Sequence, residues 1–319
     1  MSRELNPQAD GFLTELADEG VFPTYALAVS TARNKVDDLF GAAPGPADDS
    51  TIDDVLDISA PGPNGPIPLR IYRPTGEGPH PVTVFFHGGG WVLGSLDAYD
   101  GTCRTLCVET EGIVVSVDYR LAPEHPFPRG FEDAYAATEW TAEQVDQIHG
   151  DPTRIAVCGD SAGGNLAAAV SLAVRDRDWN GPELVHQALL YPALNHPDNR
   201  WFSSYDQNAE GYFLELASMR WFYDHYLSRP VDRANPYALP LEARDLTDLP
   251  ATTVLTCEFD PLRDEGRAFA DRLDENGVPV ERVHENDMIH AYLSLRHHID
   301  RGWAGLEAVG ERLREAFAE

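Results

Sequence analysis

The sequence predicts an α/β protein built on a mostly parallel sheet with helices on both faces. The first observation behind this prediction is a series of short, continuously apolar segments, which are typical of parallel strands buried on both faces. The second is that amphipathic segments of helical length separate these strands, as the crossover connections of a parallel sheet require. The third is the length of 319 residues, which α/β folds often use for one core with an insertion.

The predicted strands are bounded by turn-forming residues. Residues 52–58 and 67–72 are short extended runs, and the segment Pro61-Gly62-Pro63-Asn64-Gly65 between them predicts a hairpin. The remaining strands are expected at residues 82–86, 113–117, 155–158, 188–191, 253–257 and 280–283.

Helices are expected between these strands and towards both ends of the chain. The segments with helical periodicity are residues 102–111, 131–144, 165–175, 265–273 and 306–317. Residues 1–50 are also predicted to be helical, up to a break at residues 41–46 (Gly-Ala-Ala-Pro-Gly-Pro). From residue 195 to about residue 235 the alternation stops. We interpret this irregular, aromatic stretch as an insertion that packs with the N-terminal helices over one edge of the sheet.

The charge and the hydropathy of the chain exclude several kinds of partner. Lys and Arg number 24 and Asp and Glu number 53, so the formal net charge is −29. This charge repels phosphates, which excludes nucleic-acid binding, and it disfavours docking on anionic lipid. The polar N-terminal residues are not typical of a signal peptide, and no apolar run approaches the roughly 18 residues that cross a bilayer. A cytoplasmic protein is therefore expected.

The composition also predicts adaptation to concentrated salt. Lys35 is the single lysine, and acidic residues exceed basic ones along the whole length. Self-repulsion at this charge opposes the compact state in dilute buffer, whereas at about 1 M salt the Debye length falls to about 3 Å and screens the repulsion. The pattern resembles that of proteins from salt-loving archaea, so the fold and the activity are expected to need molar salt. The alternative is an acidic protein that is stable in dilute buffer.

The four cysteines are expected to be buried free thiols. They form no CxxC pair, and two of them lie in apolar runs that predict strands. Free thiols fit a reducing compartment. The cysteines are Cys103, Cys107, Cys158 and Cys257.

A candidate nucleophile lies in the segment Gly159-Asp160-Ser161-Ala162-Gly163, which matches the pattern G-x-S-x-G. A buried strand is expected before it, and a helix that starts with small residues is expected after it. This context predicts a sharp strand–turn–helix in which Ser161 adopts a strained backbone conformation that only small neighbours permit. The hydroxyl would then project above the sheet edge at a helix N-terminus, which favours negative charge. The alternative is an incidental serine in a glycine-rich turn.

The segment HGGGW at residues 87–91 directly follows a predicted strand and is a candidate oxyanion hole. A serine nucleophile needs an adjacent base, and its tetrahedral intermediate needs hydrogen-bond donors. Three glycines let the main chain approach a ligand, so we expect the N–H groups of Gly89, Gly90 and Ala162 to be these donors. His87 is expected to orient the loop. A phosphate-binding loop is disfavoured because the chain has no G-x-x-x-x-G-K-[ST] motif.

Four segments resemble the hormone-sensitive-lipase-like carboxylesterases, family IV of bacteria and archaea, in the α/β-hydrolase superfamily. In chain order they are HGGGWVLGS (87–95), VDYRLAPEHPFP (117–128), GDSAGGNLA (159–167) and DPLRDEG (260–266). The first and the third are the more specific. The resemblance implies an α/β-hydrolase fold with an eight-stranded, mostly parallel sheet, a helical cap, and a Ser–Asp–His triad in that chain order. It also implies hydrolysis of carboxylic esters without a cofactor.

The resemblance and the pattern along the chain together predict the domain organisation. Residues 1–50 are the N-terminal part of the helical cap, and residues 195–235 are the cap insertion. Residues 51–194 and 236–319 are the first and second parts of the α/β-hydrolase core.

Asp260 is the candidate acid of the triad. It follows the predicted strand at 253–257, at the carboxyl end where open α/β sheets place their sites. Asp264 and Glu265 are nearby rivals, but Asp264 is explained as the N-terminal cap of the next helix. The family pattern also selects the first aspartate of DPLRD, which is Asp260.

His290 is the candidate base among the four histidines that follow Asp260. His284 ends a predicted strand and is interpreted as structural, and His297 and His298 are expected on the surface of a helix. His290 lies after the strand at 280–283, in a loop at the same edge of the sheet. The family usually shows His-Gly-Phe here, whereas this chain has His-Ala-Tyr. A metal site at His297, His298 and Asp300 is not expected, because these residues lack characteristic ligand spacing.

The expected activity is hydrolysis of soluble esters with short to medium acyl chains, and the expected partner is a small-molecule ester. Trp91, Tyr205 and Phe213 are candidate residues of the substrate pocket. No metal or cofactor is expected, and a homodimer is considered as the assembly. Two alternatives are a non-catalytic small-molecule binding protein on the same fold, and another acyl-transfer hydrolase such as an amidase or a peptidase.

Overall fold

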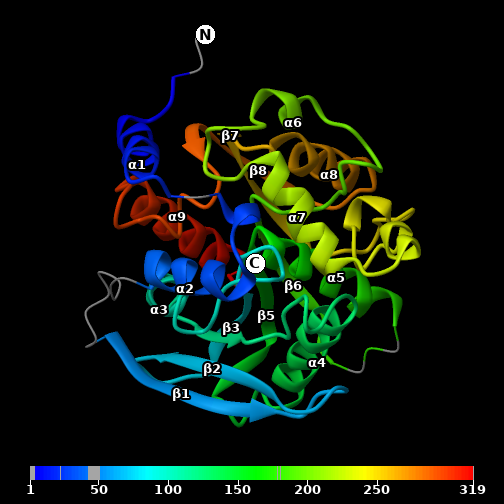
Figure 1. The fold of residues 1–319 in the computed structure, drawn as a ribbon. Coiled ribbons are helices and arrows are strands. Elements are labelled where there is room, and N and C mark those ends of the chain that lie inside the picture. Colours follow the sequence, from blue (N-terminus) through cyan, green and yellow to red (C-terminus); the bar gives the residue numbers. More distant parts are fainter. Residues whose placement is uncertain (1–3, 22, 42–50, 178, 180, 319) are drawn as a thin grey trace.

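The computed structural model describes residues 4–21, 23–41, 51–177, 179 and 181–318. Within these residues the predicted α/β architecture is confirmed, because one eight-stranded sheet in the order β1-β2-β4-β3-β5-β6-β7-β8 is flanked by helices (Figure 1). The strands are β1 (Ile52–Ala60), β2 (Ile67–Pro74), β3 (His80–Phe86), β4 (Ile113–Val117), β5 (Gly150–Asp160), β6 (Leu184–Leu190), β7 (Ala251–Phe259) and β8 (Val280–Ile289). The helices are α1 (Pro7–Asp18), α2 (Val29–Phe40), α3 (Asp100–Thr110), α4 (Arg129–Glu143), α5 (Ala162–Asp176), α6 (Ser203–Gln207), α7 (Leu216–Tyr226), α8 (Arg263–Glu275) and α9 (Arg301–Ala316).

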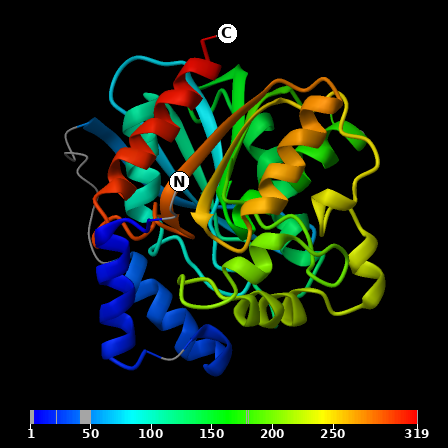
Figure 2. The same ribbon diagram turned by 90° about the horizontal axis from the view of Figure 1, so that it is seen from above.

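The sheet is apolar on both faces. β1 and β2 form the predicted antiparallel hairpin, β2 is also antiparallel to β4, and the strand pairs from β4 to β8 are parallel. Alternate residues of a strand face opposite sides, so Val84 and Phe85 of β3 enter two separate hydrophobic clusters. Residues of α4, α5 and α8 complete the first cluster, and residues of α3 and α9 complete the second. Figure 2 shows α8 and α9 on opposite faces of the sheet.

Two segments near the C-terminus differ from the expectation. β8 continues to Ile289, well beyond the predicted strand at 280–283, because residues 284–287 are polar and hide the strand from an apolar pattern. His297 and His298, which were expected in a helix, lie in a series of turns that precede α9. His298 is exposed and His297 is partly buried.

The N-terminal helices and the segment after β6 meet at one side of the sheet. Figure 2 shows α1 and α2 on the same side as α7. Val36 of α2 and Phe222 of α7 pack in a small cluster around Val92 and Leu93, so segments far apart in the chain are direct neighbours. The predicted break at residues 41–46 lies outside the described residues except for Gly41, which ends α2.

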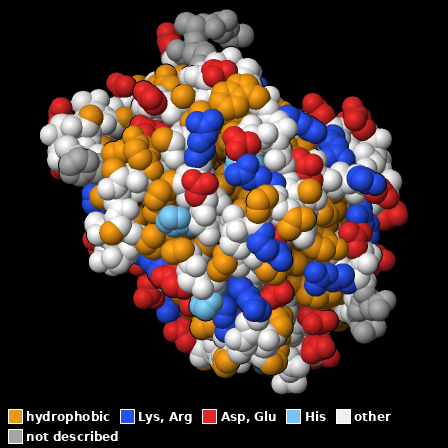
Figure 3. Space-filling model, turned by 45° about the vertical axis from the view of Figure 1, so that its right-hand side comes forward, with side chains coloured by type: hydrophobic (Ala, Val, Ile, Leu, Met, Phe, Trp, Pro, Cys, Tyr) orange, Lys and Arg blue, Asp and Glu red, His pale blue; other side chains and the backbone are white. Residues whose placement is uncertain are grey.

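The interior and the surface agree with several expectations from composition. All four cysteines are free and buried, as predicted. On the face drawn in Figure 3, acidic side chains are scattered among arginines and are not gathered in one patch. In the part of the chain that the structure describes, no helix combines the length and the apolar character needed to span a membrane.

Candidate active site

The turn between β5 and α5 places Ser161 in a strained backbone conformation. β5 ends at Asp160 and α5 begins at Ala162, so the serine alone makes the turn, with φ 55° and ψ −115°. A Cβ atom on Gly163 would lie 1.9 Å from the carbonyl oxygen of Phe86, and no side chain fits that gap. The predicted need for small neighbours therefore has a direct cause, which is the close crossing of α5 over the end of β3.

The structure brings together the three side chains that the sequence predicts as a triad. Nε2 of His290 lies 3.0 Å from Oγ of Ser161, and Nδ1 of His290 lies 2.7 Å from Oδ2 of Asp260. The main-chain N–H of Leu262 donates to the other carboxylate oxygen of Asp260 at 2.8 Å. Asp260 is fully buried, whereas Ser161 keeps 9% of its surface exposed and lines a cavity.

The two acidic rivals of Asp260 have other partners. Asp264 was expected to cap the N-terminus of α8, but this prediction is wrong, because the helix already begins at Arg263. Its carboxylate accepts instead from the N–H of Ser204, at the start of α6, at 2.9 Å. Glu265 is fully buried and accepts from the N–H of Leu194 at 2.6 Å. Neither rival is hydrogen-bonded to His290 in the structure.

The glycine loop after β3 lies against the same cavity as Ser161 and His290. Gly89 and Gly90 have positive φ angles of 104° and 61°, which side chains other than glycine rarely adopt. A Cβ atom on Gly90 would lie 2.2 Å from the ring of Phe222, so α7 packs directly on this loop. Ala162 is the first residue of α5, where main-chain N–H groups have no partner within the helix.

His87 is held as a neutral side chain beneath this loop. Its Nδ1 lies 2.8 Å from the carbonyl oxygen of Gly88, and its ring stacks on Tyr119 at 4.4 Å. Burial lowers the pKa of His87 to about 4. The hydroxyl of Tyr119 donates to the carbonyl oxygen of His87 at 2.7 Å. These contacts agree with the expectation that His87 orients the loop.

Asp160 is a buried carboxylate whose role was not predicted from the sequence. Its Oδ2 accepts from the hydroxyl of Tyr99 at 3.1 Å, and the carboxylate also accepts from the N–H of Gly88. Burial raises the pKa of Asp160 to about 6, against the lowering effect of these donors. The carboxylate thus links the nucleophile turn to the glycine loop. The variable position of G-x-S-x-G carries no local signal for this role, since the donors come from distant segments.

The cavity beside Ser161 is lined mostly by apolar side chains. It encloses about 780 Å³ that atoms do not fill, part of it open to solvent. Of the three predicted pocket residues, Trp91 and Phe213 line it. Tyr205 does not: it is fully buried, and its hydroxyl bonds to Glu265 and to Asn195. The aromatic character of the 195–235 segment did not distinguish a pocket wall from a buried hydrogen-bonding side chain. The other apolar lining residues come mainly from α2, α7 and the loop after β3.

Comparison with known proteins identifies a family model and many relatives. Residues 83–294 match the model of a family described as alpha/beta hydrolase fold. Esterase LipI of Mycobacterium tuberculosis is 44% identical over 244 residues, which are 75% of this chain and 75% of that protein. Carboxylic ester hydrolase LipN of the same organism is also 44% identical, over 76% of this chain but only 65% of its own length. An ethyl acetate hydrolase of Pseudomonas putida is 33% identical over 98% of this chain and 99% of its own length.

Solved structures of esterases have the same fold over nearly the whole chain. An ester hydrolase from the metagenome of Lake Arreo is 37% identical, covers 99% of this chain and all of its own, and superposes with a TM-score of 0.91. An esterase of Pyrobaculum calidifontis is also 37% identical, covers 98% of both chains, and superposes with a TM-score of 0.87.

Proposed function

The chain belongs to the alpha/beta hydrolase fold family and is a carboxylesterase of the serine hydrolase type, and from this premise we propose that Ser161, His290 and Asp260 carry out the hydrolysis. The observation that carries the proposal is the continuous pair of hydrogen bonds from Asp260 to His290 and from His290 to Ser161. An alcohol is a poor nucleophile at neutral pH, and this arrangement supplies the base that it needs.

Acylation uses each member of the triad in a separate role. Oγ of Ser161 attacks the ester carbonyl carbon while Nε2 of His290 takes the hydroxyl proton. Asp260 accepts a hydrogen bond from Nδ1–H, which fixes the tautomer, and its charge stabilises the imidazolium that forms. The N–H groups of Gly89, Gly90 and Ala162 are proposed to bind the oxyanion of the tetrahedral intermediate. His290 then returns the proton to the leaving alkoxide, and the acyl group stays on Ser161.

Deacylation repeats the sequence with water as the nucleophile. His290 takes a proton from water, the hydroxide attacks the acyl carbonyl, and the second tetrahedral intermediate uses the same oxyanion donors. Collapse of the intermediate returns the proton to Ser161 and releases the carboxylic acid. No external cofactor is needed to balance these steps.

Soluble esters with short to medium acyl chains are the proposed substrates. The apolar lining beside Ser161, including Trp91 and Phe213, supports an uncharged acyl group. The relative in Pseudomonas putida is named ethyl acetate hydrolase, and that name gives a short-chain ester as its substrate.

The helices over the site are proposed to form a cap with the predicted boundaries, residues 1–50 and 195–235, on a core of residues 51–194 and 236–319. The lining of the cavity supports this proposal, because Val36 and Phe40 of α2 and Met219 and Phe222 of α7 face the same space as Ser161.

Operation at high salt, in the cytoplasm of a salt-loving archaeon, remains a proposal from composition. The net charge of −29 and the single lysine support it. We expect the unfolding midpoint in urea and the esterase rate to rise together between low and molar NaCl. Full stability and activity without added salt would contradict the adaptation but leave the catalytic assignment intact.

A homodimer is also proposed as the assembly. Light scattering tests it by measuring the molar mass of the protein in solution, and the mass of a single chain would contradict the proposal.

The test of the catalytic assignment is Ser161→Ala with a nitrophenyl ester as substrate. Loss of the nucleophile should lower kcat by at least about 10³-fold, and a fluorophosphonate should label the parent protein but not the variant. Ser171→Ala is the matched control, since Ser171 is a buried serine of α5, the helix that follows Ser161, and its hydroxyl donates to the carbonyl oxygen of Ala167. Turnover by Ser161→Ala at the parent rate would refute the assignment. Rates on matched esters and amides then separate an esterase from an amidase.

A further inference from the structure

We propose that Asn208, which ends α6 in the segment between β6 and β7, is a positioning residue for the catalytic carboxylate. Its side chain holds the main chain on either side of Asp260. The inference rests on the proposed function, because it matters for catalysis only where Asp260 is the acid of the triad.

The loop that carries Asp260 leaves carbonyl groups without strand partners. β7 ends at Phe259, and its pairing with β8 shifts register between Cys257 and Phe259, so Glu258 lies at the irregularity. A buried carbonyl oxygen needs a donor from somewhere else in the protein. The pairing with β8 ends at Phe259, so it supplies no donor to Asp260. Arg263 supplies part of what is needed, because its main-chain N–H donates to the carbonyl oxygen of Asp260 at 3.2 Å and its Nη1 donates to that of Glu258 at 3.3 Å.

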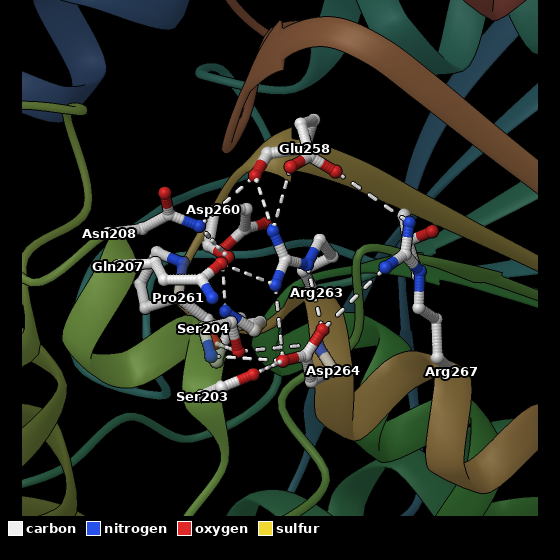
Figure 4. Close-up of polar contacts among 12 residues, drawn as sticks. Ser203, Ser204, Gln207, Asn208, Glu258, Asp260, Pro261, Arg263, Asp264 and Arg267 are labelled. Carbon is white, nitrogen blue, oxygen red and sulfur yellow. Dashed lines mark hydrogen bonds and ion pairs between the residues drawn. The ribbon is translucent and has the colours of Figure 1, made fainter. Parts of the chain in front are cut away.

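Asn208 supplies that donor twice. Its side chain is completely buried, and Nδ2 donates to the carbonyl oxygen of Asp260 at 2.9 Å and to that of Glu258 at 3.1 Å. The amide has two hydrogens on that nitrogen, so one side chain reaches both acceptors, and its bonds are shorter than those that Arg263 makes to the same two carbonyls. Figure 4 shows the amide of Asn208 directed at this part of the loop.

Ser204 holds the next carbonyl from the same short segment. Its hydroxyl donates to the carbonyl oxygen of Pro261 at 2.7 Å, and its N–H donates to Asp264 at 2.9 Å (Figure 4). The carbonyls of residues 258, 260 and 261 are therefore all held by side chains of α6 and of the residue that ends it.

The side chain of Arg263 also connects the loop that carries Asp260 to the end of α6. Its nearly buried guanidinium donates to Glu258 at 2.9 Å, to Asp264 at 2.7 Å and to Oε1 of Gln207 at 2.9 Å. Gln207 precedes Asn208, so the hydrogen bond from Arg263 ties the end of α6 to the start of α8 (Figure 4). A planar guanidinium with several partners fixes direction as well as distance.

The consequence for catalysis follows from the geometry of Asp260. Its two carboxylate oxygens accept from Nδ1 of His290 and from the N–H of Leu262, and both bonds depend on where the main chain of the loop lies. Displacement of a catalytic group by about 1 Å can lower the rate about 100-fold. The segment after β6 therefore does more than cover the cavity, because it also aligns the acid of the triad.

The first experiment compares Asn208→Ala and Asn208→Asp with the parent protein on a short-chain nitrophenyl ester at constant salt. Both variants remove the two donors, and Asn208→Asp does so at nearly unchanged volume. We expect kcat to fall about 10- to 100-fold while KM changes less than about threefold, because Asn208 does not line the cavity. Asn199→Ala is the control, since Asn199 of the same segment donates to the carbonyl oxygen of Arg233, away from the Asp260 loop. Its kcat should equal that of the parent.

A double-variant cycle with Asp260→Ala separates positioning from general damage to the fold. If Asn208 acts through Asp260, adding Asn208→Ala to Asp260→Ala lowers kcat no further. An equal additional loss in that background, or an unchanged kcat in both single variants, would overturn the proposal. Where Asn208→Ala does not fold, Ser204→Ala enters the same cycle with the same expectation. A parent-like rate for Asp260→Ala would instead contradict the proposed function, so the two failures are distinguishable.

Discussion

The two halves of the proposed catalytic site are held in place by different means. Ser161 and the glycine loop are positioned by main-chain geometry, with positive φ angles at Ser161, Gly89 and Gly90 and a contact that leaves no room for a Cβ at Gly163. Asp260 is positioned by side chains from other segments, among them Asn208. A backbone-built site tolerates almost no substitution at its contact points, whereas a side-chain-built site loses its geometry in graded steps.

The largest expected effect is on the backbone-built half. Gly163→Ala would place a Cβ 1.9 Å from the carbonyl oxygen of Phe86, and the atom that must move belongs to the main chain of β3. We expect a loss of about 4 kcal/mol or more in the free energy of unfolding, or no folded protein at all. Urea unfolding together with the esterase rate measures this. A variant with parent-like stability and rate would contradict the statement that main-chain contacts leave no room for substitution in this half of the site.

A smaller effect, which depends on pH, is expected on the free energy of unfolding through Glu265, which follows the loop that carries Asp260. Burial raises the pKa of Glu265 to about 8, although the hydroxyl of Tyr205 and the N–H of Leu194 oppose the rise. The native state therefore keeps a proton that the unfolded chain loses near pH 4.5, so this carboxyl makes stability fall as the pH rises from about 4.5 to about 8. The slope is at most about 1.4 kcal/mol per pH unit.

Glu265→Gln tests this sign, because the amide stays neutral at every pH. Relative to the variant, the parent should lose free energy of unfolding between pH 5.5 and 8, and the difference should level off above that range. Urea unfolding at several pH values in molar salt provides the measurement. Parallel curves for the two proteins would mean that Glu265 does not titrate in this window.

Tyr205→Phe is expected to have a modest effect on stability and little effect on substrate binding. The change removes the hydroxyl that bonds to Glu265 and Asn195, which should cost about 1–3 kcal/mol because buried partners lose a hydrogen bond. Tyr205 does not line the cavity, so KM for a short ester should stay within about twofold. Phe213→Ala, which opens the cavity wall, should change KM and the preferred acyl length instead. A large change of KM for Tyr205→Phe would restore its predicted role as a pocket residue.

The smallest expected effect has the opposite sign. Gly11 lies inside α1 with no atom within 4 Å of the position of an added Cβ, so Gly11→Ala costs no packing. We expect a gain of about 0.5–1 kcal/mol from reduced freedom of the unfolded chain. Thermal unfolding of Gly11→Ala and Gly163→Ala is compared with that of the parent. The comparison shows whether the loss of stability at Gly163 comes from the clash with Phe86 or from replacing any glycine with alanine. A loss of similar size at both glycines would contradict the argument.

Residues whose role depends on neighbours in the chain could be predicted from the sequence. The strand before Ser161, the glycines around it and the small residues after it are consecutive, so the sharp turn was expected and its φ of 55° agrees. His290 was also predicted, although the strand before it proved longer than the apolar pattern indicated. The expected cap role of Asp264 was wrong, because its partner Ser204 lies in a segment that no local pattern connects to it.

By itself, the sequence determined the α/β class, the strand order along the chain, the buried thiols and the three side chains of the proposed triad, since periodicity and glycine placement are local signals. Only the tertiary structure decided that Tyr205 bonds to Glu265 and does not line the cavity, that Asp160 bonds to the glycine loop, and that Asn208 holds the carbonyl of Asp260. The physical reason is that a buried polar group needs a hydrogen-bond partner, and the partner can come from any segment that packs against it. The order of residues does not show which distant segments pack together.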